Sequence, residues 1–322
     1  MNRFGWMMRR ELWEHRAIWA APLVVLALLL LGALAGNIFE TEIHVSADSA
    51  GSGETAAPGP DAAESGPASA TVQVVGPGEA VAAVPEEKRV GVLAVIYAGV
   101  SAVMFMVLGI IGFFYALDAL YADRRDRSVL FWKSLPLSDT ETVLSKFCVA
   151  AVLIPLIAAA AAIAGQLIVA VGGSIKLELT GGDGGMMLMP QVLGGGALAA
   201  VLLAVVSALW YAPVTAYLLL ASAWAPKSPF LWAVLPPTAL SMLEKIAFGS
   251  NHVGQFLKDR MLAPIITLFD DARVGDAPVQ AMDIASNISG LLTSPGMLLG
   301  LVAAAALLAG VVWLRRYRDE TT

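Results

Sequence analysis

Long apolar runs separated by polar connections dominate the chain. A transmembrane helix needs about 20 successive apolar residues, and a helix satisfies its own backbone hydrogen bonds in hydrocarbon. Six runs meet this condition, at approximately residues 17–38, 90–121, 147–171, 191–225, 229–249 and 295–314. The pattern therefore predicts an all-α integral membrane protein with six transmembrane helices, built as a single transmembrane domain over residues 1–322.

The composition supports this prediction and excludes several classes of protein. Of the 322 residues, 58% are hydrophobic and 14% are charged, whereas soluble domains average about 45–50% apolar and about 25% charged residues. A single cysteine, Cys148, leaves no internal disulfide to form. The chain is therefore neither a soluble enzyme, nor a disordered protein, nor a disulfide-stapled scaffold, and its net charge of −6 argues against nucleic-acid binding.

The charge distribution predicts that both termini are cytoplasmic. With the N-terminus inside, the cytoplasmic connections hold most of the 20 Lys and Arg residues, and the outer connections hold most of the 26 Asp and Glu residues, as the positive-inside rule requires. The first run has an alternative interpretation as a cleaved signal peptide, because Ala33-Leu34-Ala35 resembles a cleavage site. The long charged segment before it favours an uncleaved anchor.

Three connecting or terminal segments have patterns of their own. Residues 46–84, rich in Ala, Gly, Ser, Pro and acids, predict a flexible acidic extracytoplasmic loop. The extracytoplasmic segment 250–294 holds Val253, Phe256, Leu257 and Met261 at the spacing of a short amphipathic helix. In residues 1–16, the apolar positions are Phe4, Met8 and Leu12, and the basic positions include Arg9, Arg10 and Arg16. This pattern predicts an amphipathic helix in the cytoplasmic membrane interface; the alternative is a charged segment without fixed structure.

Glycines cluster at the borders of the third and fourth runs. Gly172-Gly173, Gly181-Gly182, Gly184-Gly185 and Gly194 to Gly196 lack the strand and helix context of a phosphate-binding loop, and we expect turns there. Gly32 with Gly36, and Gly296 with Gly300, have the spacing that lets two membrane helices approach closely.

Residues suited to catalysis or metal binding are scarce. His15, His44 and His252 lie in separate segments, and the sequence has no paired-Cys zinc motif, no His-Glu-x-x-His and no nucleophile elbow. We therefore expect no catalytic, cofactor-binding or metal-binding residues. Without a P-loop, any ATP that drives this protein has to bind to another chain.

The cytoplasmic connection 122–146 has the most specific pattern. It begins Asp123-Arg124-Arg125-Asp126-Arg127 and continues through Phe131-Trp132-Lys133-Ser134-Leu135-Pro136-Leu137-Ser138. Ser138 followed by Glu141 is a capping box, which predicts that a helix begins there and continues into the third run. The aromatic and aliphatic residues before it predict a short amphipathic helix with a membrane or protein partner.

These features resemble the membrane subunit of type-2 ABC exporters: six spans, internal termini, an N-terminal interfacial helix, and this loop. The resemblance covers the layout of nearly the whole chain, and residues 118–146 by motif. It implies that the connection between spans two and three is a coupling helix on which a separate ATP-binding subunit docks. By position, the coupling residues would be Asp123 to Arg127 and Phe131 to Ser138.

The resemblance also implies partners and a location. We expect two ATP-binding subunits holding ATP and Mg²⁺, a second permease subunit in a homodimer, and the bilayer of a bacterial cytoplasmic (inner) membrane. The charge-poor spans favour a hydrophobic or amphipathic substrate, and the resemblance implies that this substrate is exported.

Three alternatives remain open at the level of sequence. A secondary carrier would need central polar residues and internal repeats. A non-transporting anchor or sensor could recruit a cytoplasmic partner through the same connection. A membrane enzyme would need site chemistry that the sequence lacks.

Overall fold

The computed structural model describes residues 3–35, 41–43, 72–74, 86–126, 138–179, 181, 183–270, 290 and 293–318. The elements in chain order are α1 (Arg3–Glu14), α2 (Ala17–Ala35), β1 (Thr41–Ile43), β2 (Val72–Val74), α4 (Glu86–Arg125), α6 (Asp139–Cys148), a π-helical turn (Val149–Leu153), α7 (Ile154–Leu179), a 3₁₀ helix (Gly184–Leu188), α8 (Pro190–Trp210), α9 (Ala212–Trp224), α10 (Pro229–Phe248), α11 (His252–Asp270) and α13 (Pro295–Arg318).

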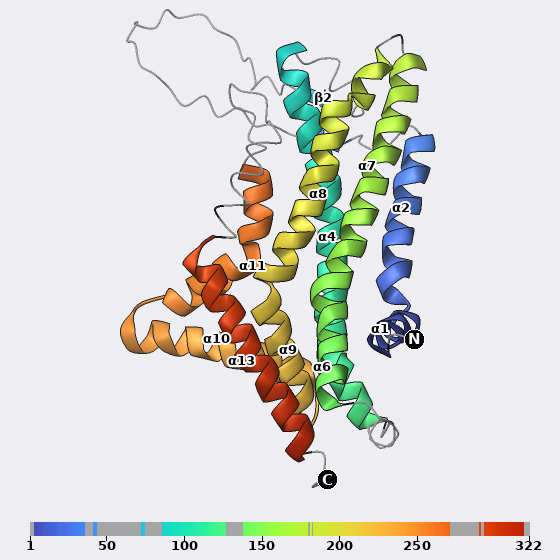
Figure 1. Cartoon of the computed structure of the whole chain (residues 1–322). Helices are drawn as coiled ribbons and strands as arrows, with labels where there is room; N and C mark the ends of the chain where they lie inside the picture. The colour runs from blue at the N-terminus through green and yellow to red at the C-terminus, as the bar shows by residue number, and fades with distance from the viewer. Residues whose placement is uncertain are drawn as a thin grey trace, which may run out of the picture.

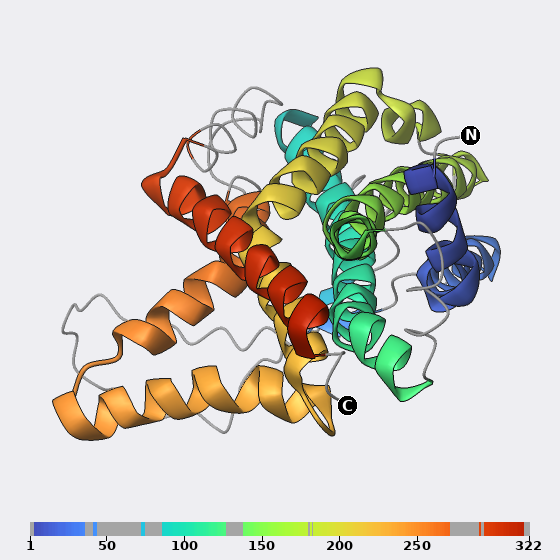
Figure 2. The same ribbon diagram turned by 60° about the horizontal axis from the view of Figure 1, so that its bottom comes forward.

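A bundle of long helices forms the body of the molecule. Helices α2, α4, α7 and α8 run side by side, and α1 lies across the end of α2, toward the end of the bundle that α13 also reaches (Figure 1). Figure 2 shows α10 and α11 extending to one side of this bundle. Helix α13 packs mainly against α9, so the second half of the chain contributes a separate flank of the bundle.

Five helical segments are long and apolar enough to cross a membrane: Ala17–Leu34, Arg89–Arg125, Asp139–Leu179, Gly184–Trp210 and Pro295–Tyr317. They make the chain a multi-pass membrane protein and correspond to five of the six runs found in the sequence. Helix α10, which covers the run at 229–249, is not among these five, and it lies across the bundle axis (Figure 1).

Helix α4 is longer than a bilayer requires. Its 40 residues extend about 60 Å at about 1.5 Å per residue, against a hydrocarbon core of about 30 Å. The helix is therefore about twice as long as the hydrocarbon core is thick, and its last turn carries Asp123 and Arg124. The charged residues at this end can therefore meet other polar segments.

Prolines account for the irregular points in the helices. Pro155 has no N–H for the carbonyl of Ala151, and the preceding turn is π-helical, with the N–H of Ile154 donating to the carbonyl of Val149. The fourth run is divided at Tyr211 into α8 and α9, two residues before Pro213.

Helix α10 stays continuous through two internal prolines, Pro236 and Pro237. These prolines leave the carbonyls of Trp232 and Ala233 without their helical donors. The hydroxyl of Tyr217 on α9 donates to both, at 3.3 Å and 3.1 Å. This contact joins the inner part of α10 to α9.

Two of the glycine clusters lie inside helices, where the sequence predicted turns. Gly172 and Gly173 lie inside α7, and Gly194 to Gly196 lie inside α8, so the prediction of turns was wrong at both places. At Gly172 a methyl group would lie 2.7 Å from the Cβ of Ala33, so glycine permits the close contact of α7 with α2. Gly181, with φ of +83°, lies in a turn.

The outer connections are described only in part. Strands β1 and β2 pair antiparallel, with Glu42 opposite Gln73, and β2 falls within the segment predicted to be a flexible loop. The other residues of 46–84 lie outside the described residues. In the segment 250–294, the predicted helix is confirmed as α11, which is longer than expected.

Candidate functional site

The end of α4 and the start of α6 flank the connection that the sequence marks as a coupling segment. Ser138 caps α6 as predicted: its hydroxyl accepts from the N–H of Glu141 at 3.2 Å, and its own N–H donates to the Glu141 carboxylate at 2.9 Å. This confirms the capping box and the helix that starts there. The helix runs on through the π-helical turn into α7.

The predicted coupling residues fall into two groups. Asp123, Arg124, Arg125, Asp126 and Ser138 belong to the part of the chain that the structure describes. The others lie outside the described residues, namely Arg127, Phe131, Trp132, Lys133, Ser134, Leu135, Pro136 and Leu137. The role of both groups in coupling stays a prediction.

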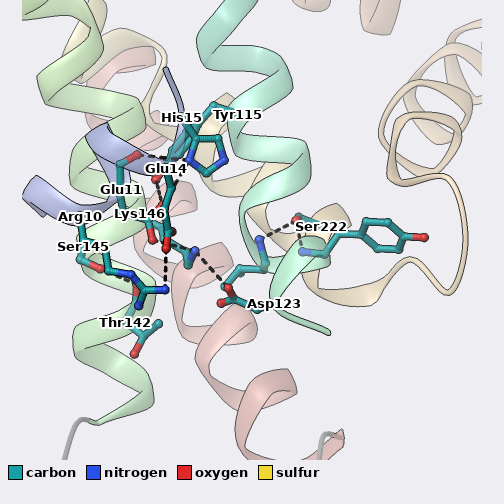
Figure 3. A network of polar contacts seen from close by, with 12 residues as sticks. Arg10, Glu11, Glu14, His15, Tyr115, Asp123, Thr142, Ser145, Lys146 and Ser222 are labelled. Atoms are coloured by element: carbon teal, nitrogen blue, oxygen red, sulfur yellow. Dashed lines mark hydrogen bonds and ion pairs between the residues drawn. The ribbon is translucent and has the colours of Figure 1, made fainter. Parts of the chain in front are cut away.

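Five ionic side chains from four helices meet beside these flanks, and we call them the charge cluster: Glu11 of α1, Asp123 of α4, Asp139 and Lys146 of α6, and Arg315 of α13. Lys146 Nζ lies 2.9 Å from Glu11 Oε1 and 3.5 Å from Asp123 Oδ1. Arg315 lies 3.3 Å from Asp123 Oδ2 and 3.0 Å from Asp139 Oδ1. Figure 3 shows Lys146 between Glu11 and Asp123.

The charge cluster is largely removed from solvent. The side chains of Lys146 and Arg315 are each 5% exposed, Glu11 is 10% exposed and Asp123 is 13% exposed. The Tyr115 hydroxyl adds a hydrogen bond to Glu11 Oε2 at 2.9 Å. Buried charges are stable only when paired and hydrogen-bonded, so the cluster fixes the four helices relative to one another.

Arg124 anchors the same end of α4 to α9. Its Nη2 donates to the carbonyls of Ser222 and Ala225 at 2.6 Å and 3.0 Å. The Ser222 hydroxyl in turn accepts from the N–H groups of Leu120 and Tyr121 at 3.1 Å and 2.9 Å (Figure 3). Arg124 is therefore a structural contact within this chain.

Arg125 and Asp126 differ from their neighbours in being exposed. They form an ion pair with each other at 3.1 Å, with side chains 54% and 61% exposed. Of the predicted coupling residues in the described part of α4 and its end, these two are the ones available to a partner protein.

The N-terminal segment is helical, as predicted, and two of its faces can be distinguished. Met7 and Glu11 are buried, whereas Trp6, Arg9 and Trp13 are exposed. Of the other residues assigned to an interfacial helix, Phe4, Met8, Arg10 and Leu12 are half-buried and Arg16 is exposed. The location of this helix in a membrane interface stays a prediction.

Sequence reasoning missed most of the charge cluster. It used Lys146 and Arg315 only to orient the chain, and it assigned no role to Glu11, Tyr115 or Asp139. One signal was present: Glu11 lies one helical turn after Met7, on the side of the helix that carries apolar residues. A carboxylate on such a face calls for a buried partner.

A groove of about 390 Å³ opens between α6 and α13 next to the charge cluster. Its walls include Val143, Leu144, Leu308, Trp313 and Tyr317. Within the described part of the chain, no group of three or more His, Cys, Asp or Glu residues is placed to hold a metal ion.

Comparison with known proteins shows a similarity to a transporter family. Residues 91–213 match the family model described as an ABC-2 family transporter protein. A search of curated proteins and a search of solved structures found no match. The matched region runs from α4 into α9 and contains the capped start of α6 together with Asp123, Asp139 and Lys146. This part of the chain is therefore similar to the membrane subunit of ABC-2 (type-2 ABC) family transporters.

Proposed function

We propose that this chain exports a hydrophobic or amphipathic substrate across a bacterial inner membrane, powered by two ATP-binding subunits that dock on residues 123–138. In this proposal two copies of the chain form a homodimer. ATP and Mg²⁺ bind to the docked subunits, and this chain performs no hydrolysis. Both termini and the docking segment lie on the cytoplasmic side.

The observation that carries the proposal is the charge cluster. A force exerted on residues 123–138 by a docked subunit would act on the rest of the chain at two points, the end of α4 and the start of α6. Asp123 belongs to the first point and Asp139 to the second, and the Arg315 guanidinium lies within 3.3 Å of both carboxylates. A displacement of the docking segment would therefore move α4, α6 and α13 together.

Lys146 extends this connection to the N-terminal helix through Glu11. Because α1 leads directly into α2, a displaced α6 would also tilt the first membrane helix. The π-helical turn at 149–153 lies between the docking side and α7, and such turns are frequent at functional sites. We propose that the helix bends at this turn, so that a displacement of α6 rotates α7.

The positions of the two terminal helices support the proposal that both termini lie on the same side of the membrane. Both α1 and the C-terminal part of α13 lie toward the same end of the bundle (Figure 1). An even number of crossings is needed for this arrangement. We propose that α10 and α11 together supply the crossing that the sequence assigned to 229–249.

The first experiment is purification of the tagged chain from its native host in a mild detergent, with identification of the proteins that accompany it. We expect a stoichiometric ATP-binding protein and ATP hydrolysis in the complex. The double variant Phe131→Ala with Trp132→Ala should lose both, because it removes the apolar docking surface, while the folded chain stays in the membrane.

A matched control is Phe248→Ala with Phe256→Ala, which removes two exposed aromatic residues of α10 and α11. This control should retain the partner and the hydrolysis. A chain that purifies alone in several detergents would contradict the proposed coupling. A partner that remains bound to a complex without nucleotide-dependent transport in vesicles would favour the anchor or sensor function.

A further inference from the structure

Arg260 is a buried cation where α11 meets the end of α8 and the start of α13. The residue is 6% exposed. Its guanidinium carbon lies 4.3 Å from the ring centre of Trp210, and its Nη1 donates to the carbonyl of Gly296 at 3.1 Å. Its Nε and Nη2 are buried and make no hydrogen bond with any described residue.

The backbone around Arg260 is held in place by contacts with the break between α8 and α9. Pro264 has no N–H to donate to the carbonyl of Arg260, and the Trp210 indole donates to this carbonyl at 2.9 Å. The hydroxyl of Tyr211 donates to the next carbonyl, that of Met261, at 2.7 Å. The guanidinium is therefore carried by a segment with a fixed position.

Gly300 makes room for the guanidinium on α13. A methyl group at this position would overlap Arg260 Nη2. The pair Gly296 and Gly300, whose spacing suggested a close helix–helix contact, here accepts an arginine side chain. One face of the guanidinium is covered by Trp210 and Nη1 is used by Gly296.

The two unpaired nitrogens share one edge of the guanidinium. This Nε–Nη2 edge is the one that presents two parallel N–H donors to a carboxylate or phosphate. Arginine remains protonated in proteins, so burial does not remove the charge, and a buried charge without an opposite charge is strongly destabilised. The chemistry of the edge therefore calls for an oxyanion.

A cluster of apolar side chains lies beside Arg260. Val206, Trp210 and Met297 are buried together, with Leu202 and Leu301 packed against them. We propose that the Nε–Nη2 edge of Arg260 binds the phosphate or carboxylate group of an anionic amphipath, whose hydrocarbon part contacts these residues. That this amphipath is the transported substrate rests on the proposed function, whereas the binding itself does not.

The test uses the full chain, purified without any partner in a neutral detergent. Radiolabelled phosphatidylglycerol is titrated against it, with zwitterionic phosphatidylcholine in parallel. We expect saturable binding of phosphatidylglycerol and no saturable binding of phosphatidylcholine. Arg260→Met should weaken it about thirtyfold or more, because truncating one partner of a buried charge pair has this effect. Arg260→Lys, which keeps the charge without the two-donor edge, should bind with intermediate affinity.

The matched control is Lys258→Met, which removes an exposed positive charge from the same helix. It should bind phosphatidylglycerol as the natural chain does. Folding is checked by thermal unfolding without lipid, where Arg260→Met should be at least as stable as the natural chain, because it removes an uncompensated charge. Phosphatidylglycerol should raise the unfolding temperature of the natural chain and of Lys258→Met, and not that of Arg260→Met.

Several outcomes would overturn the proposal. These are undiminished binding by Arg260→Met, equal losses in Arg260→Met and Lys258→Met, or equal binding of the two lipids. Inorganic phosphate should displace phosphatidylglycerol only weakly, because it lacks hydrocarbon; efficient displacement would assign the site to a free anion instead. Since no ATP-binding subunit is present, loss of the partner in the purification experiment and loss of lipid binding are separate results.

Discussion

Lys146→Met tests whether the charge cluster holds the docking end of the molecule together. The ammonium lies 2.9 Å from Glu11 Oε1 and 3.5 Å from Asp123 Oδ1. With an effective dielectric constant of about 20, these distances correspond to attractions of about 6 and about 5 kcal/mol. Dehydration of the three groups offsets most of that energy.

The change in the free energy of unfolding depends on the charged groups that remain buried after the substitution. Methionine fills the space of the lysine stem, so the cavity term is small, but Glu11 and Asp123 lose a shared counter-charge in a site that is largely buried. Removing one partner of a buried ion pair costs about 3–5 kcal/mol. We expect the free energy of unfolding to fall by about this amount, and we expect weaker retention of the ATP-binding subunit.

The assay is reversible unfolding of the purified chain in mixed micelles, followed by circular dichroism. Lys227→Met, which removes an exposed lysine, is the control and should change the free energy by less than about 0.5 kcal/mol. In the double variant with Glu11→Gln, the carboxylate that would have lost its counter-charge is itself replaced by a neutral amide. The combined loss should therefore be smaller than the sum of the two single losses by about 1–3 kcal/mol.

Two results would refute the reasoning. The first is a Lys146→Met chain as stable as Lys227→Met, which would mean that the Lys146 ammonium is exposed to water in the folded protein. The second is additivity of Lys146→Met and Glu11→Gln within about 0.5 kcal/mol, which would mean that the two groups do not interact.

Three further substitutions test the packing of the bundle. Ser138→Ala should cost about 1 kcal/mol of unfolding free energy through loss of the cap, and an unchanged unfolding curve would contradict the capping box. Gly172→Ala should cost about 1–3 kcal/mol by forcing α7 away from Ala33, and adding Ala33→Gly should restore most of it; absence of this rescue would argue against the contact. Tyr217→Phe should cost about 1 kcal/mol, because its hydroxyl donates to the carbonyls that the α10 prolines leave open; equal stability in a denaturant titration would exclude that bond.

The sequence by itself determined the features that depend on neighbouring residues. Apolar runs of sufficient length predict membrane helices wherever they occur in the chain, and five of the six runs are found as candidate spans. The capping box at Ser138 is equally local, because both of its hydrogen bonds join residues three positions apart. The motif around 118–146 suggested a resemblance to the same family whose model matches residues 91–213.

The sequence could not determine how glycines and prolines are used. Gly172 lies inside α7, at a point where Ala33 of α2 leaves no room for a side chain. Gly300 accepts Arg260, whereas the spacing with Gly296 suggested a second helix. The same residue type serves turns, helix contacts and side-chain pockets, and only its neighbours in space decide which.

Only the tertiary structure decided the two charged sites. Glu11 and Lys146 are 135 positions apart, and Asp123 and Arg315 are 192 positions apart, so no periodicity or motif could pair them. In the sequence Arg260 was one more basic residue in an outer connection. Ion pairing depends on distances of a few ångströms between side chains and on their burial, and both quantities exist only once the helices have packed.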